Sequence, residues 1–111
     1  MGPLLVPAMD ALPEAITRLV GAFDPIRIVM FGSNARGDAR PDSDLDLLVV
    51  LGSMENKREA AVSMIRALRG IPAVIEAIPT DLAEIERRGS MPGDVLRAAL
   101  REGKVVYERS V

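Results

Sequence analysis

The chain has no cysteine and no histidine among its 111 residues, and aromatic residues make up only 3%. Without cysteine there can be no disulfide and no thiolate zinc site, and without histidine any proton transfer falls to carboxylates, lysine, tyrosine or water. One tyrosine and two phenylalanines cannot build a stacking platform for single-stranded nucleic acid. The net charge of -2 also argues against an extended nucleic-acid surface.

Long apolar runs are missing as well, and none approaches the roughly 20 residues that a membrane-spanning helix needs. The apolar start, residues 1–7, is too short for a signal peptide and lacks its basic residues, so we expect a cytoplasmic protein without membrane contact. With 49% hydrophobic residues, the chain is expected to form a single domain over 1–111, with a loose lead-in at 1–9.

Helical and strand-like hydrophobic spacing alternate along the chain. The spacing predicts helices at about 11–22, 54–69 and 92–102, a short helix capped by Asp81 and Glu84, and strands at about 26–31, 45–51, 73–78 and 105–107. This alternation predicts an α/β (α+β) fold in which helices pack on a small mixed sheet. In the helix at 54–69, we expect the inner edge to be formed by Val62, Ile65, Leu68 and Arg69, with Arg69 lying along the surface.

The most informative stretch joins a small turn, Gly32-Ser33, to two aspartates, Asp44 and Asp46, at the start of an apolar strand. Alternate strand residues face the same side of a sheet, so the two carboxylates would share one face. They would repel each other unless a divalent cation lies between them, and their oxygen atoms suit Mg²⁺. Gly32 would let a phosphate approach the backbone, where free N–H groups and the Ser33 hydroxyl can bind its oxygens.

Each part of this motif also has a purely structural interpretation. Gly-Ser is a common turn, Ser43-Asp44 could cap a helix, and an Asp-x-Asp pair could simply be solvated. However, the run at 47–51 is strand-like rather than helical. The two parts together, on neighbouring strands at this spacing, favour a functional site.

The stretch at 31–50 resembles the signature of the DNA polymerase β-like nucleotidyltransferase superfamily, and within it the minimal nucleotidyltransferases of bacteria and archaea. Between the two halves, Ala35-Arg36-Gly37 and Pro41-Asp42-Ser43 match residues familiar from that signature, and residues 100–108 resemble the family's closing helix, turn and strand. The resemblance implies the polymerase β-like palm. It also implies an enzyme of the EC 2.7.7 type, which moves a nucleoside monophosphate, AMP in the first place, from a triphosphate such as ATP to an acceptor hydroxyl.

Nucleotidyl transfer with two metal ions normally uses three carboxylates, the third of which can also accept the proton of the attacking hydroxyl. In the family the third acid lies on the next core strand, where this chain offers Glu76. Many relatives place Asp two residues after a comparable proline, where this chain has Val74, and Glu76 follows two residues later on the same strand face. We therefore predict Asp44, Asp46 and Glu76 as catalytic residues and ligands of two Mg²⁺ ions, unless Glu76 is only an exposed residue at a strand edge.

The resemblance assigns nucleotide binding to Gly32, Ser33 and Arg36, although Arg36 could instead be a solvated loop residue. Asp42 is expected to serve the turn before Ser43, and Arg40 and the pair at 87–88 are expected at the surface.

Minimal nucleotidyltransferases are often encoded with a helical HEPN partner, and many act as the antitoxin of that pair. This leaves open a second hypothesis, an antitoxin that works mainly by binding a HEPN partner with weak or no transfer. A plain nucleotide-binding regulator is a third, but paired aspartates exceed what binding alone requires. A chain of this length leaves no room for a separate substrate domain, so a partner protein or a second copy in a homo-oligomer is expected to complete the acceptor site.

Overall fold

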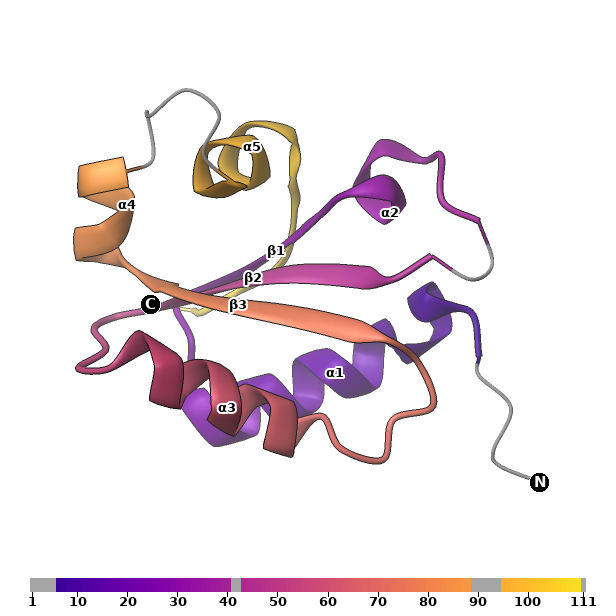
Figure 1. The fold of residues 1–111 in the computed structure, drawn as a ribbon, viewed down its shortest axis with the longest axis horizontal. Coiled ribbons are helices and arrows are strands. Elements are labelled where there is room, and N and C mark those ends of the chain that lie inside the picture. The colour runs from indigo at the N-terminus through magenta and orange to yellow at the C-terminus, as the bar shows by residue number, and fades with distance from the viewer. Residues whose placement is uncertain (1–5, 41–42, 89–94, 111) are drawn as a thin grey trace.

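A four-stranded sheet forms the centre of the computed structural model, which describes residues 6–40, 43–88 and 95–110 (Figure 1). Along this described part of the chain the elements are α1 (Ala8–Phe23), β1 (Arg27–Phe31), α2 (Ser33–Arg36), β2 (Leu45–Leu51), α3 (Lys57–Ala67), β3 (Ile75–Asp81), α4 (Leu82–Arg88), α5 (Val95–Glu102) and β4 (Lys104–Glu108). The strands lie in the order β3-β2-β1-β4. β1 is antiparallel to both β2 and β4, whereas β2 and β3 are parallel. This mixed sheet with packed helices confirms the predicted fold class.

The two faces of the sheet follow from the alternation of side chains along β2. Leu45, Leu47 and Val49 point to one face, where they join a core cluster with residues of α1 and α3. Leu48 and Val50 point to the other face and pack with residues of α5. Figure 1 shows α1 and α3 on one side of the sheet, with α4 and α5 on the other side at one end and α2 at the opposite end. Asp44, which precedes β2, and Asp46, its second residue, therefore extend the face shared by α5 and α2.

Several boundaries differ from those predicted by periodicity. α1 begins at Ala8 rather than at 11, so it takes in the last two residues of the expected lead-in. It ends at Phe23, and the following Asp24 caps it in a left-handed conformation (φ 47°). β3 continues past Ile78 through Pro79, which an edge strand tolerates: among the described strands, β3 pairs with β2 alone. Pro92, expected in the first turn of the last helix, and residues 1–5 lie outside the described residues.

The predicted inner edge of α3 is confirmed for Leu68 but wrong for Val62 and Ile65. Ile65 is 67% exposed and Val62 40% exposed, whereas Met64 is fully buried and Leu68 nearly so. Met64 and Leu68 lie four residues apart and share a face with the half-buried Ala60 and Ala67. The helix thus turns its small alanines and one long methionine toward the sheet, and its β-branched residues toward solvent.

The link between β3 and α4 differs in detail from a reciprocal capping pair. Asp81 Oδ1 accepts the Glu84 N–H at 2.8 Å, as a helix cap does. The buried Glu84 carboxylate does not reach back but accepts hydrogen bonds from Thr80 Oγ1 at 2.7 Å and Lys57 Nζ at 2.8 Å. This network joins α4 to the first turn of α3, at the end of the sheet remote from Asp44.

Among the described residues, no helix has the length and apolarity to cross a membrane.

Candidate active site

The turn between β1 and α2 carries the first half of the sequence motif. β1 ends at Phe31, Gly32 follows with φ 76°, and α2 begins at once with Ser33. The Gly32 carbonyl accepts the N–H groups of Ala35 and Arg36, both at 3.1 Å, and so closes the first turn of α2. The sharp reversal is possible because glycine adopts a positive φ at little cost.

Gly32 lies directly against Asp46, because Phe31 pairs with Asp46 in the antiparallel register of β1 and β2. A Cβ added to Gly32 would overlap Oδ2 of the Asp46 carboxylate. The sequence had indicated that Gly32 leaves room for a phosphate. The structure adds a second reason for glycine at this position, since any side chain here would displace a carboxylate of the site.

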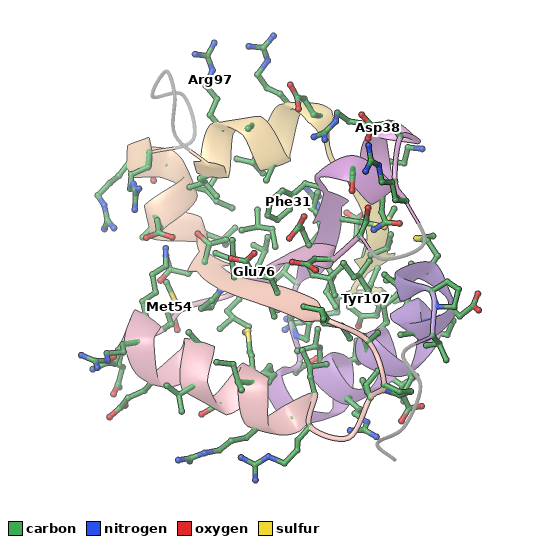
Figure 2. All side chains as sticks on the ribbon, turned by 45° about the vertical axis from the view of Figure 1, so that its right-hand side comes forward. Phe31, Asp38, Met54, Glu76, Arg97 and Tyr107 are labelled. Atoms are coloured by element: carbon green, nitrogen blue, oxygen red, sulfur yellow. The ribbon has the colours of Figure 1, made fainter. Side chains whose placement is uncertain are left out.

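The parallel register of β2 and β3 brings the third acid beside the second. Asp46 pairs with Glu76, and directly paired residues of neighbouring strands point to the same face. Asp44 lies two residues before Asp46 and therefore on this face as well. Figure 2 shows Glu76 and Phe31 on the side of the sheet toward α5. Asp44 and Glu76 are exposed, whereas Asp46 is half-buried between its neighbours.

Val74 occupies the neighbouring position one step earlier. The Val74 carbonyl accepts the Leu45 N–H at 3.0 Å, immediately before the Leu45–Ile75 pair. Val74 is therefore placed beside Asp44 as Glu76 is placed beside Asp46, and it is 52% exposed. The two positions considered for the third acid thus share one face and lie two residues apart, Val74 just before β3 and Glu76 within it.

The electrostatics of the site are dominated by its crowded carboxyl groups. Burial raises the pKa of Asp46 from 3.8 to about 6, and the charge of Glu76, a hydrogen bond with Glu76 and the charge of Asp44 act in the same direction. The Arg36 guanidinium opposes this shift. Negative charge at Asp46 is therefore costly unless a cation neutralises it, which is the condition that a divalent metal ion would meet.

The donor chemistry fits a hard divalent cation of open coordination. Within the described residues, no group of three His, Cys, Asp or Glu side chains is arranged to hold a metal ion together. Mg²⁺ is commonly held by only one or two carboxylates and completed by water and substrate phosphates. The Asp46–Glu76 pair, with Asp44 on the same face, offers that kind of partial, all-oxygen ligand set.

The remaining predicted residues lie around this centre. Ser33 is half-buried at the start of α2, while Arg36 is exposed at its end, where Nε contacts Asp38 Oδ2 at 3.4 Å. Arg40 is exposed, as expected, and its backbone N–H donates to Ser43 Oγ at 2.8 Å. Asp42 lies outside the described residues.

Sequence reasoning missed one residue that contacts the motif, Asn34. Its side-chain Nδ2 donates to the backbone carbonyl of Asp44 at 2.8 Å and so joins the two halves of the motif. A contact between a side chain and a distant backbone leaves no periodic signal, and only the Gly-Ser turn just before Asn34 marked this region.

Comparison with known proteins places the chain in a family. The model of the nucleotidyltransferase domain family matches residues 10–104, which include the whole motif, Glu76 and the helix α5. The chain belongs to this family. It is a minimal nucleotidyltransferase of the polymerase β-like superfamily, as the resemblance in its motif indicated.

A solved structure shares the fold of this nucleotidyltransferase. The crystal structure of a provisionally assigned nucleotidyltransferase from Sulfolobus solfataricus matches with a TM-score of 0.65 and 22% sequence identity, over 92% of this chain and 81% of that chain. At this identity the match establishes the common fold alone. No curated protein matches the chain significantly. Family membership confirms the predicted enzyme class, a nucleotidyltransferase, while the roles of individual site residues stay predictions.

Proposed function

We propose that this nucleotidyltransferase transfers AMP from ATP to a hydroxyl group of a partner protein, with Asp44, Asp46 and Glu76 as ligands of Mg²⁺. The observation that carries the proposal is the pairing of Asp46 with Glu76 on one sheet face, directly against the Gly32 turn. The family supplies the class of reaction. That the donor is ATP and the acceptor a protein is part of our proposal. We also propose that the enzyme is cytoplasmic, where ATP and Mg²⁺ are both available.

In this reaction the acceptor oxygen bonds to the α-phosphorus of ATP, and the bond from that phosphorus to the leaving pyrophosphate breaks. Bound Mg²⁺ would neutralise phosphate charge and favour ionisation of the acceptor hydroxyl. In this proposal the Gly32 turn receives the triphosphate, and Ser33 and Arg36 would bind its oxygens. Glu76, exposed at the edge strand, is the group that we propose accepts the hydroxyl proton.

The exposure of the site supports a macromolecular acceptor. Asp44, Val74 and Glu76 are all exposed, so a hydroxyl can approach them from outside. A partner protein or a second copy of the chain would bring its own surface to the reaction. The alternative, an antitoxin that mainly binds a HEPN partner, is favoured by one observation, an apolar Val74 beside Asp44 where many relatives have Asp.

Label transfer tests the proposed reaction directly. ATP labelled on its α-phosphate should pass label to a protein acceptor, such as a co-purified HEPN protein or the chain itself, only when Mg²⁺ is present. ATP labelled on its γ-phosphate should release that label as pyrophosphate, because the bond beyond the α-phosphorus breaks. Passage of γ-label to protein would instead indicate a kinase, and ATP binding with no transfer to any tested acceptor would favour the binding-only alternative.

The Gly32 turn gives a second prediction, for which the chain contains a matched control. Gly32→Ala should weaken binding of ATP with Mg²⁺, because the new Cβ forces the Asp46 carboxylate away. It should also destabilise the fold by about 1–3 kcal/mol, because φ 76° with ψ -158° is a backbone conformation that essentially only glycine adopts. Isothermal titration calorimetry and denaturant unfolding measure the two effects.

Gly37→Ala is the control, since Gly37 also has a positive φ (83°) but an added Cβ there meets nothing within 4 Å. Gly37 is in the left-handed helical region (φ 83°, ψ 9°), so Gly37→Ala should cost about 1–2 kcal/mol of stability, with little loss of ATP affinity. Equal affinities in the two folded variants would remove the Gly32 turn from the binding site.

A further inference from the structure

Asn34 forms a direct link between the two halves of the motif. It lies in the first turn of α2, two residues after Gly32, and its Nδ2 donates to the carbonyl of Asp44 at 2.8 Å. The bond spans ten positions of the chain and joins the first turn of α2 to the residue that precedes β2. The neighbouring Leu45 N–H donates in the other direction, to the carbonyl of Val74, the residue just before β3. The peptide that joins Asp44 to Leu45 is thus held from both sides, by Asn34 of α2 and by Val74.

Such a link has a specific consequence for Asp44. This residue is exposed and precedes β2, so packing contributes little to holding its carboxylate in place. Asp46, in contrast, is fixed by strand pairing on both sides, with Phe31 and with Glu76. The position of Asp44 therefore depends on its backbone contacts. The contact from the Asn34 amide is the one that ties Asp44 to the turn at Gly32.

We propose that Asn34 is a positioning residue, which sets the distance between the turn at Gly32 and the Asp44 carboxylate. The proposal rests on the proposed function, in which Asp44 holds the metal ion and the turn receives the triphosphate. Asparagine suits the task because a neutral amide donates to a carbonyl without adding charge to a crowded acidic site. Aspartate at the same position would have the same shape but no donor, and leucine would fill the volume without any polar atom.

The test uses Mn²⁺ as a probe of the metal site, with three variants. Asn34→Leu should weaken Mn²⁺ binding to the ATP-free protein by roughly 10-fold, the lower range for loss of a group that orients a metal ligand. Asn34→Asp should weaken Mn²⁺ binding less, because its charge attracts the ion, but should slow transfer as much. Asn34→Gln keeps an amide donor, so it should have a higher Mn²⁺ affinity and a faster transfer rate than Asn34→Leu. Electron paramagnetic resonance measures free Mn²⁺, and amide hydrogen exchange of residues 43–46 in the metal-free protein should rise in Asn34→Leu.

Asn56 provides the matched control, because its side chain also bonds the backbone, accepting the Glu59 N–H at 3.0 Å to cap α3 far from the motif. Asn56→Leu should lower thermal stability and leave the Mn²⁺ affinity unchanged. Equal Mn²⁺ affinity and unchanged exchange at 43–46 in Asn34→Leu would overturn the positioning role alone. If the unaltered protein bound no Mn²⁺ and transferred no label, the proposed function itself would fail, and the positioning role with it.

Discussion

Asp46→Asn should abolish nucleotidyl transfer, by at least about 100-fold, and at the same time make the metal-free protein more stable. Transfer is lost because an amide at position 46 carries no negative charge and so binds the proposed metal ion only weakly. Stability rises because the amide relieves the repulsion that Glu76 and Asp44 exert on Asp46 and can donate a hydrogen bond to the Glu76 carboxylate. A gain of about 1 kcal/mol is expected at neutral pH, once solvent screening at this partly exposed group is taken into account.

The pH dependence of unfolding shows whether the negative charge of Asp46 stabilises or destabilises the fold. Between 3.8 and about 6, the Asp46 carboxyl binds more protons in the folded than in the unfolded chain. The stability that Asp46 contributes must therefore fall as pH rises through this window, and stay low above it. Asp46→Asn removes this fall, so its advantage over the unaltered protein should be larger at pH 8 than at pH 4 when divalent ions are absent.

Denaturant unfolding at the two pH values, with and without Mg²⁺, measures these differences. Mg²⁺ should stabilise the unaltered protein and have little effect on Asp46→Asn. Asp44→Asn should also lose transfer but gain less stability, because Asp44 is exposed. Asp10→Asn, the same charge change on the exposed side of α1, is the control and should gain nothing. Full activity of both the Asp44 and the Asp46 variants would show that these aspartates do not form the metal site.

The parts of the fold that could be predicted from the sequence are those that local spacing determines. β2 was predicted at 45–51 and is found at Leu45–Leu51, because a continuous apolar run bounded by aspartates and by Gly52 has few other interpretations. The orientation of α3 could not be obtained in the same way. Val62 and Ile65 outweigh alanine on any hydrophobicity scale, yet the sheet leaves room for alanines and Met64, which depends on packing between elements rather than on one helix.

The residues of the candidate site also fall into two groups: those that local sequence identifies and those whose position depends on pairing between distant strands. Asp44, Asp46 and the Gly32 turn lie within fifteen residues of each other, so alternation along one strand and one familiar motif were enough to select them. The position of Glu76 depends on the register between β2 and β3, which α3 separates in the chain. A shift by one residue would have turned Glu76 to the opposite face. The close approach of Gly32 to Asp46 is likewise a product of strand register.

The register leads to a prediction that separates Glu76 from its alternative. Glu76→Gln should slow transfer by about 100-fold while ATP affinity falls only a few-fold, since a group that accepts a proton acts mainly in the transition state. Adding Val74→Asp to Glu76→Gln should restore part of the rate. Val74 is 52% exposed and lies beside Asp44 on the same face, so a carboxylate there is solvated and can reach the same ion.

Single-turnover transfer of α-phosphate label, with ATP affinity from calorimetry, distinguishes the two effects. Glu86→Gln on the exposed side of α4 carries the same chemical change away from the site and should behave like the unaltered protein. A Glu76→Gln variant with an unchanged rate would make Glu76 only an exposed residue of an edge strand. If Val74→Asp alone then raised a weak basal rate, the third carboxylate would be absent from the natural chain, and a nucleotidyltransferase that works mainly by binding its partner would explain the site better. Partial rescue of the double variant, with no gain from Val74→Asp alone, would instead place the third carboxylate of this enzyme at Glu76.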